Sequence, residues 1–204
     1  NMARALVSGL VGSGYESNKI VIANPSKEKL QYFSESLSVR TTSDNIEAAQ
    51  QADVIVYAVK PHKVRLISEQ LCEVVMQNQS LVLSVAAGVT IGSISQWLKY
   101  TGPIVRAMPN TPASIGEGCT GLFANTAVSD EQRILVERIF GSIGVFAWLP
   151  KESLLNAITA VSGSSPAYIF YIMEAMQKAA ITMGLDGNTA SLFIAQSVLG
   201  TAKL

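Results

Sequence analysis

The hydrophobic residues of the first 150 positions alternate between two patterns. Short continuous runs rich in β-branched residues are bounded by Gly, Pro or polar clusters, and such runs are typical of strands covered on both faces. Between the runs, apolar residues recur at helical spacing. The predicted strands are 19–23, 53–59, 81–87, 103–108, 119–124 and 144–149, with helices near 26–37, 44–51, 63–76 and 91–100. This βαβ order predicts an α/β domain with a mostly parallel sheet and helices on both faces.

The boundaries of several helices are predicted by local signals. The first helix has an apolar stripe formed by Ala3, Leu6, Val7, Leu10 and Val11, and we expect it to end near Gly12. Asp44 with Glu47, and Ser129 with Gln132, have the spacing of capping boxes, so we expect helices to begin at these points.

After Pro150 the strand pattern disappears and only helical spacing remains. The segment 167–185 is apolar but contains Glu174, Gln177 and Lys178, which favours a buried helix over a membrane span. Its Met residues between 173 and 183 are expected in the core or in a subunit interface. A further helix is expected from Asn188 or Thr189 up to Leu204. We therefore predict two domains, 1–150 and 151–204, and a second subunit covering the apolar helices of the second domain.

Composition and charge narrow the classes of partner. The chain of 204 residues is 49% hydrophobic, and its 15 Lys and Arg balance its 15 Asp and Glu. A net charge of zero without a basic cluster argues against nucleic acid and against an anionic membrane surface as partners. Cys72 and Cys119 fit neither a metal site nor a disulfide framework, which indicates a reducing compartment and a cytoplasmic location. No metal is expected.

The loop after the first predicted strand bears on the choice of nicotinamide cofactor. Dinucleotide-binding folds place an Asp or Glu there to bind the adenosine ribose, whereas this chain has Asn24, Pro25 and Ser26, followed by Lys27. A hydroxyl and a cation without a carboxylate favour a 2′-phosphate, and so NADP over NAD. The alternative is an ordinary helix N-cap.

Three more loops follow strands of the same predicted sheet, and the carboxyl edge of such a sheet is where ligands bind. They contain Lys60-Pro61, the small residues Ala86 to Gly88, and Asn110 between two prolines. Each loop alone is also explained as a turn. Other candidates have simpler explanations: His62 as a solvated residue, Cys119 as a core residue, and Glu152 as a first-turn glutamate.

In this order, the motifs "AVKPH", "AAGVTI", "RAMPNTPA", "AVSGSSPAY" and "KAAITMGL" resemble the pyrroline-5-carboxylate reductase family over the whole chain. The resemblance implies a Rossmann-type domain followed by an all-α dimerisation domain. It implies NADPH-dependent reduction of 1-pyrroline-5-carboxylate to L-proline, with NADH as the alternative cofactor. The implied assembly is a homodimer through the C-terminal helices, or a higher oligomer built from it.

The resemblance also assigns residues to the cofactor site. In the family a strand leads into a G-x-G-N-M-A turn at a helix N-terminus, and Asn1, Met2 and Ala3 match its last three positions. We expect that strand before Asn1. The remaining cofactor contacts implied are Asn24, Ser26, Asn45, Ala58, Val59, Lys60, Pro61, Ala86, Ala87 and Gly88. Pro25 stands where the family often has Arg.

Substrate residues are implied in the same way. Met108 and Asn110 would form the wall beside the nicotinamide, and Ser162 and Pro166 would lie beside the substrate. Glu152 would stabilise the ring nitrogen and is the one catalytic candidate. Ser165 replaces a common glycine, and the family's carboxylate-binding loop is expected beyond Leu204. The alternatives are a related imine or β-hydroxyacid reductase, disfavoured because 153–161 has no lysine, and a non-catalytic NADP-binding or dimerisation module.

Overall fold

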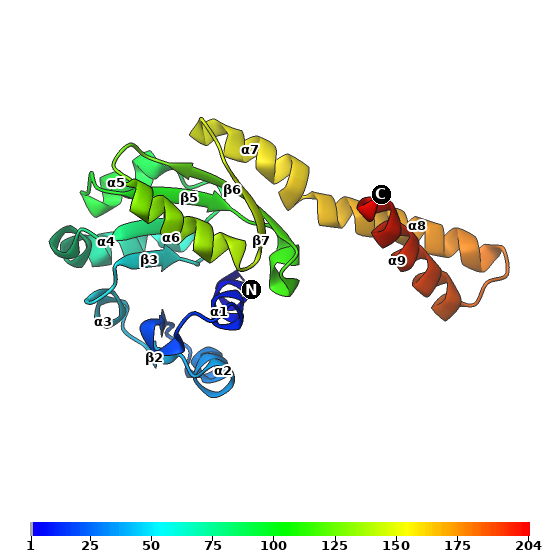
Figure 1. The fold of residues 1–204 in the computed structure, drawn as a ribbon, viewed down its shortest axis with the longest axis horizontal. Coiled ribbons are helices and arrows are strands. Elements are labelled where there is room, and N and C mark those ends of the chain that lie inside the picture. The colour runs from blue at the N-terminus through cyan, green and yellow to red at the C-terminus, as the bar shows by residue number, and fades with distance from the viewer. Residues whose placement is uncertain (1) are drawn as a thin grey trace. The chain divides into compact units, whose positions relative to one another are not determined.

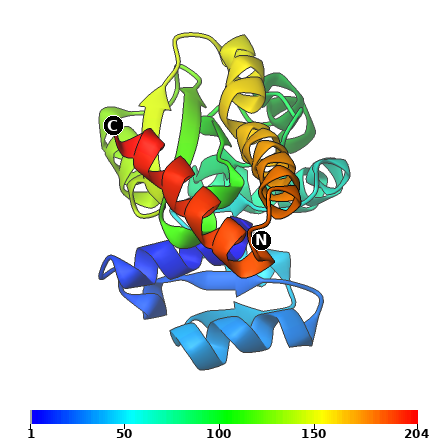
Figure 2. The ribbon, with the colours of Figure 1, turned by 90° about the vertical axis from the view of Figure 1, so that its right-hand side faces the viewer.

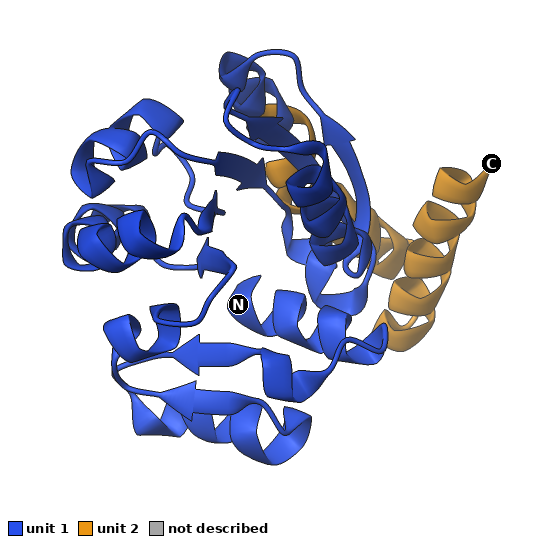
Figure 3. Cartoon of the chain, turned by 60° about the vertical axis from the view of Figure 1, so that its left-hand side comes forward, with its two compact units in different colours: residues 1–159 blue, residues 160–204 orange. Residues whose placement is uncertain are grey.

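The computed structural model describes residues 2–204, and Asn1 lies outside the described residues. The chain divides into unit 1, residues 1–159, and unit 2, residues 160–204 (Figure 3). This division falls nine residues after the predicted domain boundary.

Unit 1 contains the strands, in two sheets (Figure 1). A two-stranded parallel sheet pairs β1 (Val21–Ala23) with β2 (Arg40–Thr42). The second sheet has the order β3-β4-β5-β6-β7. Its strands are β3 (Val54–Tyr57), β4 (Leu81–Ser84), β5 (Ile104–Met108), β6 (Gly118–Ala124) and β7 (Gly144–Trp148). Only the β5–β6 pair is antiparallel, which confirms the predicted, mostly parallel α/β sheet.

Helices cover both faces of the five-stranded sheet. On one face α4 (Pro61–Asn78) and α5 (Ile91–Leu98) bury Val64, Leu71, Ile94 and Leu98 against β3, β4 and β5. On the other face α1 (Met2–Gly12) and α6 (Asp130–Gly141) pack their apolar stripes against strand residues such as Leu83 and Leu122. Figures 2 and 3 place α1 between the two sheets. The predicted first helix is therefore confirmed over Met2–Gly12.

The remaining elements of unit 1 are short. They are α2 (Lys27–Leu37), α3 (Asn45–Ala49), α7 (Leu155–Ile158) and the 3-10 turns η1 (Ser17–Lys19), η2 (Thr111–Ile115) and η3 (Glu152–Leu154). A five-residue π-helix, η4 (Thr159–Gly163), crosses the division between the units. Unit 2 also contains α8 (Ser165–Thr182) and α9 (Gly187–Lys203), which pack against each other.

Four local expectations need correction. The strand β2 was not predicted, because three residues are too few to show a hydrophobic pattern. Asp44 caps α3 by accepting from Ile46 N, but Glu47 accepts from the Thr42 hydroxyl instead of completing a capping box. The box of Ser129 and Gln132 is confirmed. The last helix begins at Gly187, before the expected Asn188 or Thr189, because Asp186 is its N-cap.

The fourth correction concerns Cys119, which is exposed and not part of the core. It pairs in register with Val145 of the edge strand β7, which is 67% exposed. Neighbouring residues of β6 and β7 point to the opposite face, where α1 and α6 cover them. Because side chains alternate along a strand, an apolar run alone does not say which of its faces is covered.

Candidate functional site

The carboxyl ends of β3, β4 and β5 lie at one edge of the sheet, because these three strands are parallel neighbours. The loop after each strand contains one group of predicted site residues: 58–61, 86–88 and 108–110. The structure therefore places these three groups at a common edge, where open parallel sheets bind ligands.

The loop after β1 is ordered by Asn24. Its Oδ1 accepts from Ser26 N at 2.9 Å, and its own backbone N donates to Thr42 O at 3.1 Å. Ser26 is the N-cap of α2, and its side chain forms no capping hydrogen bond. The loop thus presents a hydroxyl at a helix N-terminus and no carboxylate at the position after the strand.

Asn45, the other residue expected near the adenosine, opens α3. Its Nδ2 donates to Gln70 Oε1 on α4 at 3.0 Å, in an exposed contact. The side chain therefore links α3 to α4 and lies at the surface of unit 1.

The segment 58–61, predicted to contact the cofactor, presents mainly backbone groups. Ala58 N donates to Val56 O at 3.1 Å, and Lys60 is the N-cap of α4 without a side-chain cap. Pro61 occupies the first turn of α4, where its missing N–H costs nothing. Before this loop, burial raises the pKa of Tyr57 to about 12, the nearby Ser68 hydroxyl opposing the shift, so the phenol stays neutral at physiological pH.

The segment 86–88 forms a tight turn between β4 and α5. Ala86 N donates to the buried Ser84 Oγ at 3.3 Å, and Val85 N donates to Tyr57 O at 3.2 Å. Gly88 has a φ of +76°, and a Cβ added there would meet no atom within 4 Å. The turn therefore has open space in front of backbone that carries no side chain, as close approach of a flat ring requires.

The β5–β6 connection is held by Asn110, which is 8% exposed. Its Oδ1 accepts from Cys119 N at 2.9 Å and so joins the end of β5 to the start of β6. Met108, two residues earlier, is half-buried. The amide of Asn110 thus fixes the loop that contains both predicted wall residues.

Glu152 joins three segments of unit 1. Its Oε1 accepts from Ile91 N, in the first turn of α5, at 2.8 Å and from Arg106 Nη1, on β5, at 3.1 Å. The Arg106 side chain is 8% exposed and that of Glu152 is 25% exposed. We call these three groups the Glu152 clasp: the Arg106 guanidinium, the Glu152 carboxylate and the Ile91 backbone N–H.

Arg106 was not among the predicted site residues, although it lies inside the motif "RAMPNTPA". A charged residue within an otherwise apolar strand is the signal that could have found it, because buried charges are paired. Glu152 is separated from it by 46 residues, so only the tertiary structure identifies the partner.

The remaining predicted site residues lie near the start of unit 1 and in unit 2. Met2 packs partly buried against the core under α1 and α6, and Ala3 packs against the core formed by α1 and α2. Asn1 lies outside the described residues. Ser162 lies in η4 and Pro166 in the first turn of α8, both within unit 2.

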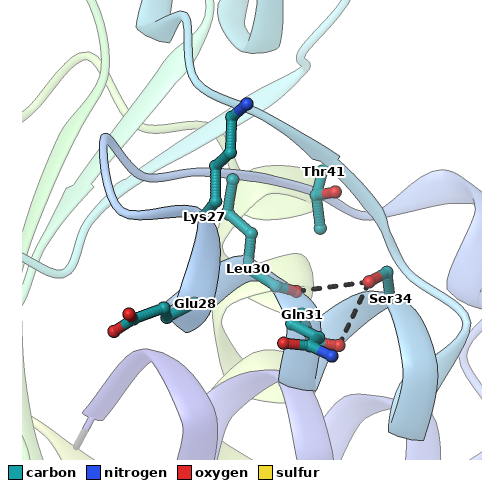
Figure 4. Close-up of a pocket in the computed structure, with 6 residues that line it drawn as sticks. All are labelled: Lys27, Glu28, Leu30, Gln31, Ser34 and Thr41. Atoms are coloured by element: carbon teal, nitrogen blue, oxygen red, sulfur yellow. Dashed lines mark hydrogen bonds between the residues drawn. The ribbon is translucent and has the colours of Figure 1, made fainter.

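A shallow pocket of about 420 Å³ lies beside α2 and β2 (Figure 4). It is lined by Lys27, Glu28, Leu30, Gln31, Ser34 and Thr41, of which only Lys27 entered the cofactor prediction, as the cation that favours a 2′-phosphate. In Figure 4 Lys27 and Leu30 project to the side on which Thr41 lies, while Glu28 points away. Residues 2–204 contain no group of three His, Cys, Asp or Glu side chains that could hold a metal ion.

Two family models match the chain. Residues 1–88 match "NADP oxidoreductase coenzyme F420-dependent", and residues 152–204 match "Pyrroline-5-carboxylate reductase dimerisation". The matches support the fold predicted from the sequence, a Rossmann-type NADP-binding domain followed by a helical domain.

Curated relatives match the whole chain. A pyrroline-5-carboxylate reductase of Haemophilus influenzae is 40% identical over 204 residues, covering 100% of this chain and 74% of the relative. The Escherichia coli enzyme of that name is 37% identical over 206 residues, covering 100% of this chain and 76% of the relative.

Solved structures of pyrroline-5-carboxylate reductases are also similar to this chain. A pyrroline-5-carboxylate reductase from Coxiella burnetii has a TM-score of 0.95 and 47% identity, over 99% of this chain and 75% of that one. A Plasmodium falciparum pyrroline carboxylate reductase with NADP bound has a TM-score of 0.87 and 27% identity, over 99% of this chain and 74% of that one. A prephenate dehydrogenase from Aquifex aeolicus, at 15% identity and a TM-score of 0.65, shares the fold alone.

Proposed function

Because the chain belongs to the pyrroline-5-carboxylate reductase family and is an NADPH-dependent oxidoreductase acting on 1-pyrroline-5-carboxylate, we propose which of its residues perform each part of the reaction. The main support for this activity is that the entire chain matches a reductase of this name at 40% identity. The product is L-proline, and the reaction is the last step of proline biosynthesis.

Bound NADPH supplies a hydride to the imine carbon of the substrate, and the protein orients the two rings and excludes water. The residues fit such a cofactor in two places. Gly88 leaves open space beside its backbone, as a flat ring needs. The loop after β1 offers the Ser26 hydroxyl at the start of α2, and the position directly after the strand is Asn24 and not a carboxylate.

The proposed cofactor site follows these loops. The adenosine end is bound near Asn24, Ser26 and Asn45, and the nicotinamide end near the 86–88 turn. The backbone of 58–61 lines the site between them, and Asn1, Met2 and Ala3 approach the pyrophosphate.

The proposed substrate residues of unit 1 are Met108, Asn110 and Glu152. Ser162 and Pro166 are proposed substrate residues within unit 2. Oε1 of Glu152 is held by the clasp, so we assign the second carboxylate oxygen, Oε2, to the ring nitrogen of the substrate. A carboxylate there stabilises an iminium, and a protonated imine needs no stronger acid.

We propose that two copies associate through α8 and α9. Among the described residues of unit 2, only Ala190 and Ile194 are buried hydrophobics. Its most exposed large apolar side chains include Phe170, Tyr171, Leu192 and Phe193, at 64–76% exposure. A helical pair with so little core needs a partner surface, and residues 152–204 match a dimerisation family.

Two coarser proposals complete the assignment. We place the functional boundary between the cofactor domain and the dimerisation domain after residue 150, close to the start of the dimerisation match at 152. We propose a cytoplasmic location, supported by the free thiols of Cys72 and Cys119. No helix among the described residues is long and apolar enough to cross a membrane.

The activity is tested by following NADPH oxidation at 340 nm with 1-pyrroline-5-carboxylate and the full-length protein. We expect turnover with NADPH and slower turnover with NADH. A matched reaction with a 2-hydroxy-acid dehydrogenase substrate, pyruvate, is the control and should show no oxidation. Absence of turnover with the imine at any pH would contradict the proposal.

Asn24→Asp should shift the preference from NADPH toward NADH by about tenfold in the ratio of kcat/KM values. Aspartate keeps the oxygen that accepts from Ser26 N, so the turn is preserved, but its charge repels a 2′-phosphate and can bind a ribose diol. The control is Asn18→Asp, which introduces the same charge at an exposed asparagine of η1, outside this loop. An unchanged cofactor ratio in Asn24→Asp would exclude Asn24 from the adenosine site.

A further inference from the structure

We propose that Arg106 is a positioning residue for the reduction: through the Glu152 clasp it sets the orientation in which Glu152 meets the substrate. This inference rests on the proposed function, because it assigns Oε2 of Glu152 to the substrate. It adds a residue that makes no contact with substrate or cofactor itself.

Arg106 lies on β5, on the same face of the sheet as a proposed wall residue. Residues two apart on a strand point to the same face, so Arg106, Ile104 and Met108 share a face of the sheet. Ile104 lies in the core under α4 and α5. Arg106 therefore lies one pleat from Met108, a proposed wall residue, on the face that α5 covers.

The buried positive charge of Arg106 is paired with the carboxylate of Glu152. An arginine side chain that is only 8% exposed requires a partner for its charge, and the Glu152 carboxylate supplies it at 3.1 Å. The same carboxylate oxygen also accepts from Ile91 N at 2.8 Å. Two donors on Oε1 leave the Glu152 side chain little rotational freedom, so the direction of Oε2 is determined by them.

The Glu152 clasp connects three segments of unit 1. Ile91 follows the 86–88 turn, Arg106 precedes Met108 and Asn110, and Glu152 begins the segment that leads to α7. Next to the clasp, α7 lies close against β6, since a Cβ added at Gly121 would be 2.8 Å from Ile158 Cγ1. One carboxylate oxygen thus ties together three segments proposed to line the site.

Glu152 can act on the substrate through its net charge or through the placement of its Oε2 atom, and these two contributions are distinct. The buried Arg106 charge neutralises much of the Glu152 charge, so the pair as a whole offers the substrate little net negative potential. The contribution of Glu152 then depends on the placement of Oε2. A misplacement of even about 1 Å can lower a rate by up to about 100-fold.

The experiment compares Arg106→Met, Arg106→Lys and the double variant Arg106→Met/Glu152→Met in the full-length protein, with Arg65→Met as the matched control. Arg65 also forms an arginine–glutamate pair, with Glu69 at 2.8 Å, but its side chain is 68% exposed. The readouts are kcat and KM for 1-pyrroline-5-carboxylate, the dissociation constant of NADPH, and the melting temperature.

We expect Arg106→Met to lower kcat/KM for the imine by about tenfold, mainly in kcat, with the NADPH dissociation constant unchanged within about threefold. Arg106→Lys should recover part of the loss, and Arg65→Met should behave as wild type. The double variant removes both buried charges together, so its melting temperature should exceed that of Arg106→Met while its turnover stays low.

Arg106→Lys keeps the inference testable even where Arg106→Met does not fold, because it retains the buried charge and the contact partner Glu152 but changes the geometry of the donor to Oε1. A folded Arg106→Lys with a wild-type kcat would overturn the inference. Recovery of turnover together with stability in the double variant would overturn the inference, because the clasp would then serve the fold alone. Wild-type kinetics in a folded Arg106→Met would overturn it as well. Failure of the wild-type protein to turn over the imine is a separate result, which contradicts the proposed function instead.

Discussion

Glu152→Ala is expected to lower kcat/KM for 1-pyrroline-5-carboxylate by about 100-fold, while the dissociation constant of NADPH stays within about threefold of wild type. The substitution removes both the oxygen assigned to the ring nitrogen and the acceptor that holds Ile91 N and Arg106. The turn at 86–88 keeps its own hydrogen bonds through Ser84 and Tyr57, so cofactor binding should persist. Steady-state kinetics with both substrates and fluorescence titration of NADPH measure the two effects.

Two controls separate the chemistry from loss of the fold. Glu152→Gln retains one acceptor oxygen for the clasp but places an NH2 group where Oε2 would face the ring nitrogen. Its melting temperature should therefore exceed that of Glu152→Ala, while kcat/KM stays low. Glu69→Ala removes the carboxylate of the exposed Arg65 pair and should leave turnover unchanged. If NADPH binding collapses in Glu152→Ala while substrate handling is spared, the assignment of Glu152 to the substrate is wrong.

A charge placed on the exposed apolar face of unit 2 should convert the dimer to a monomer and abolish most of the activity. Tyr171→Asp and Phe193→Asp alter side chains that are 76% and 64% exposed, one on each helix of the α8–α9 pair. Burying a carboxylate in place of an aromatic anchor costs about 2–4 kcal/mol, and a two-fold interface contains each substitution twice.

The measurement is the mass in solution, by light scattering, together with the rate of NADPH oxidation at matched protein concentration. Lys178→Ala is the control, because Lys178 is an exposed side chain of α8 paired with Glu174 at 2.7 Å. It should remain a dimer. Dimers of wild-type stability in both aspartate variants would place the interface elsewhere than on α8 and α9.

The sequence by itself determined the class of fold and its order of elements. Residues 81–83 are apolar and buried on successive positions, a pattern typical of strands that are covered on both faces. The crossover helices are recognisable because their stripes repeat every three to four residues. The same local logic located the Ser129 capping box and the end of α1, since both depend on residues close together in the chain.

The family was also readable from sequence, because the motifs after the strands occur in one order along the whole chain. Three of the four loops, after β3, β4 and β5, could be assigned to one region because equivalent ends of parallel strands share an edge. The expectation was wrong for the loop after β1, because β1 pairs with β2 in a separate sheet. The individual contacts could not be assigned in this way. Asn45 bonds to Gln70, and Asn110 to the backbone of Cys119, through packing that a linear motif does not encode.

Only the tertiary structure decided which faces are covered and which charges meet. Cys119 is exposed because it lies on the face of β6 opposite to the one that α1 and α6 cover, and its own apolar surroundings do not reveal which face is covered. Arg106 and Glu152 are 46 residues apart, and each alone has an ordinary local explanation. Their pairing follows from the burial of a guanidinium on β5, since a charge removed from water must find its partner in three dimensions.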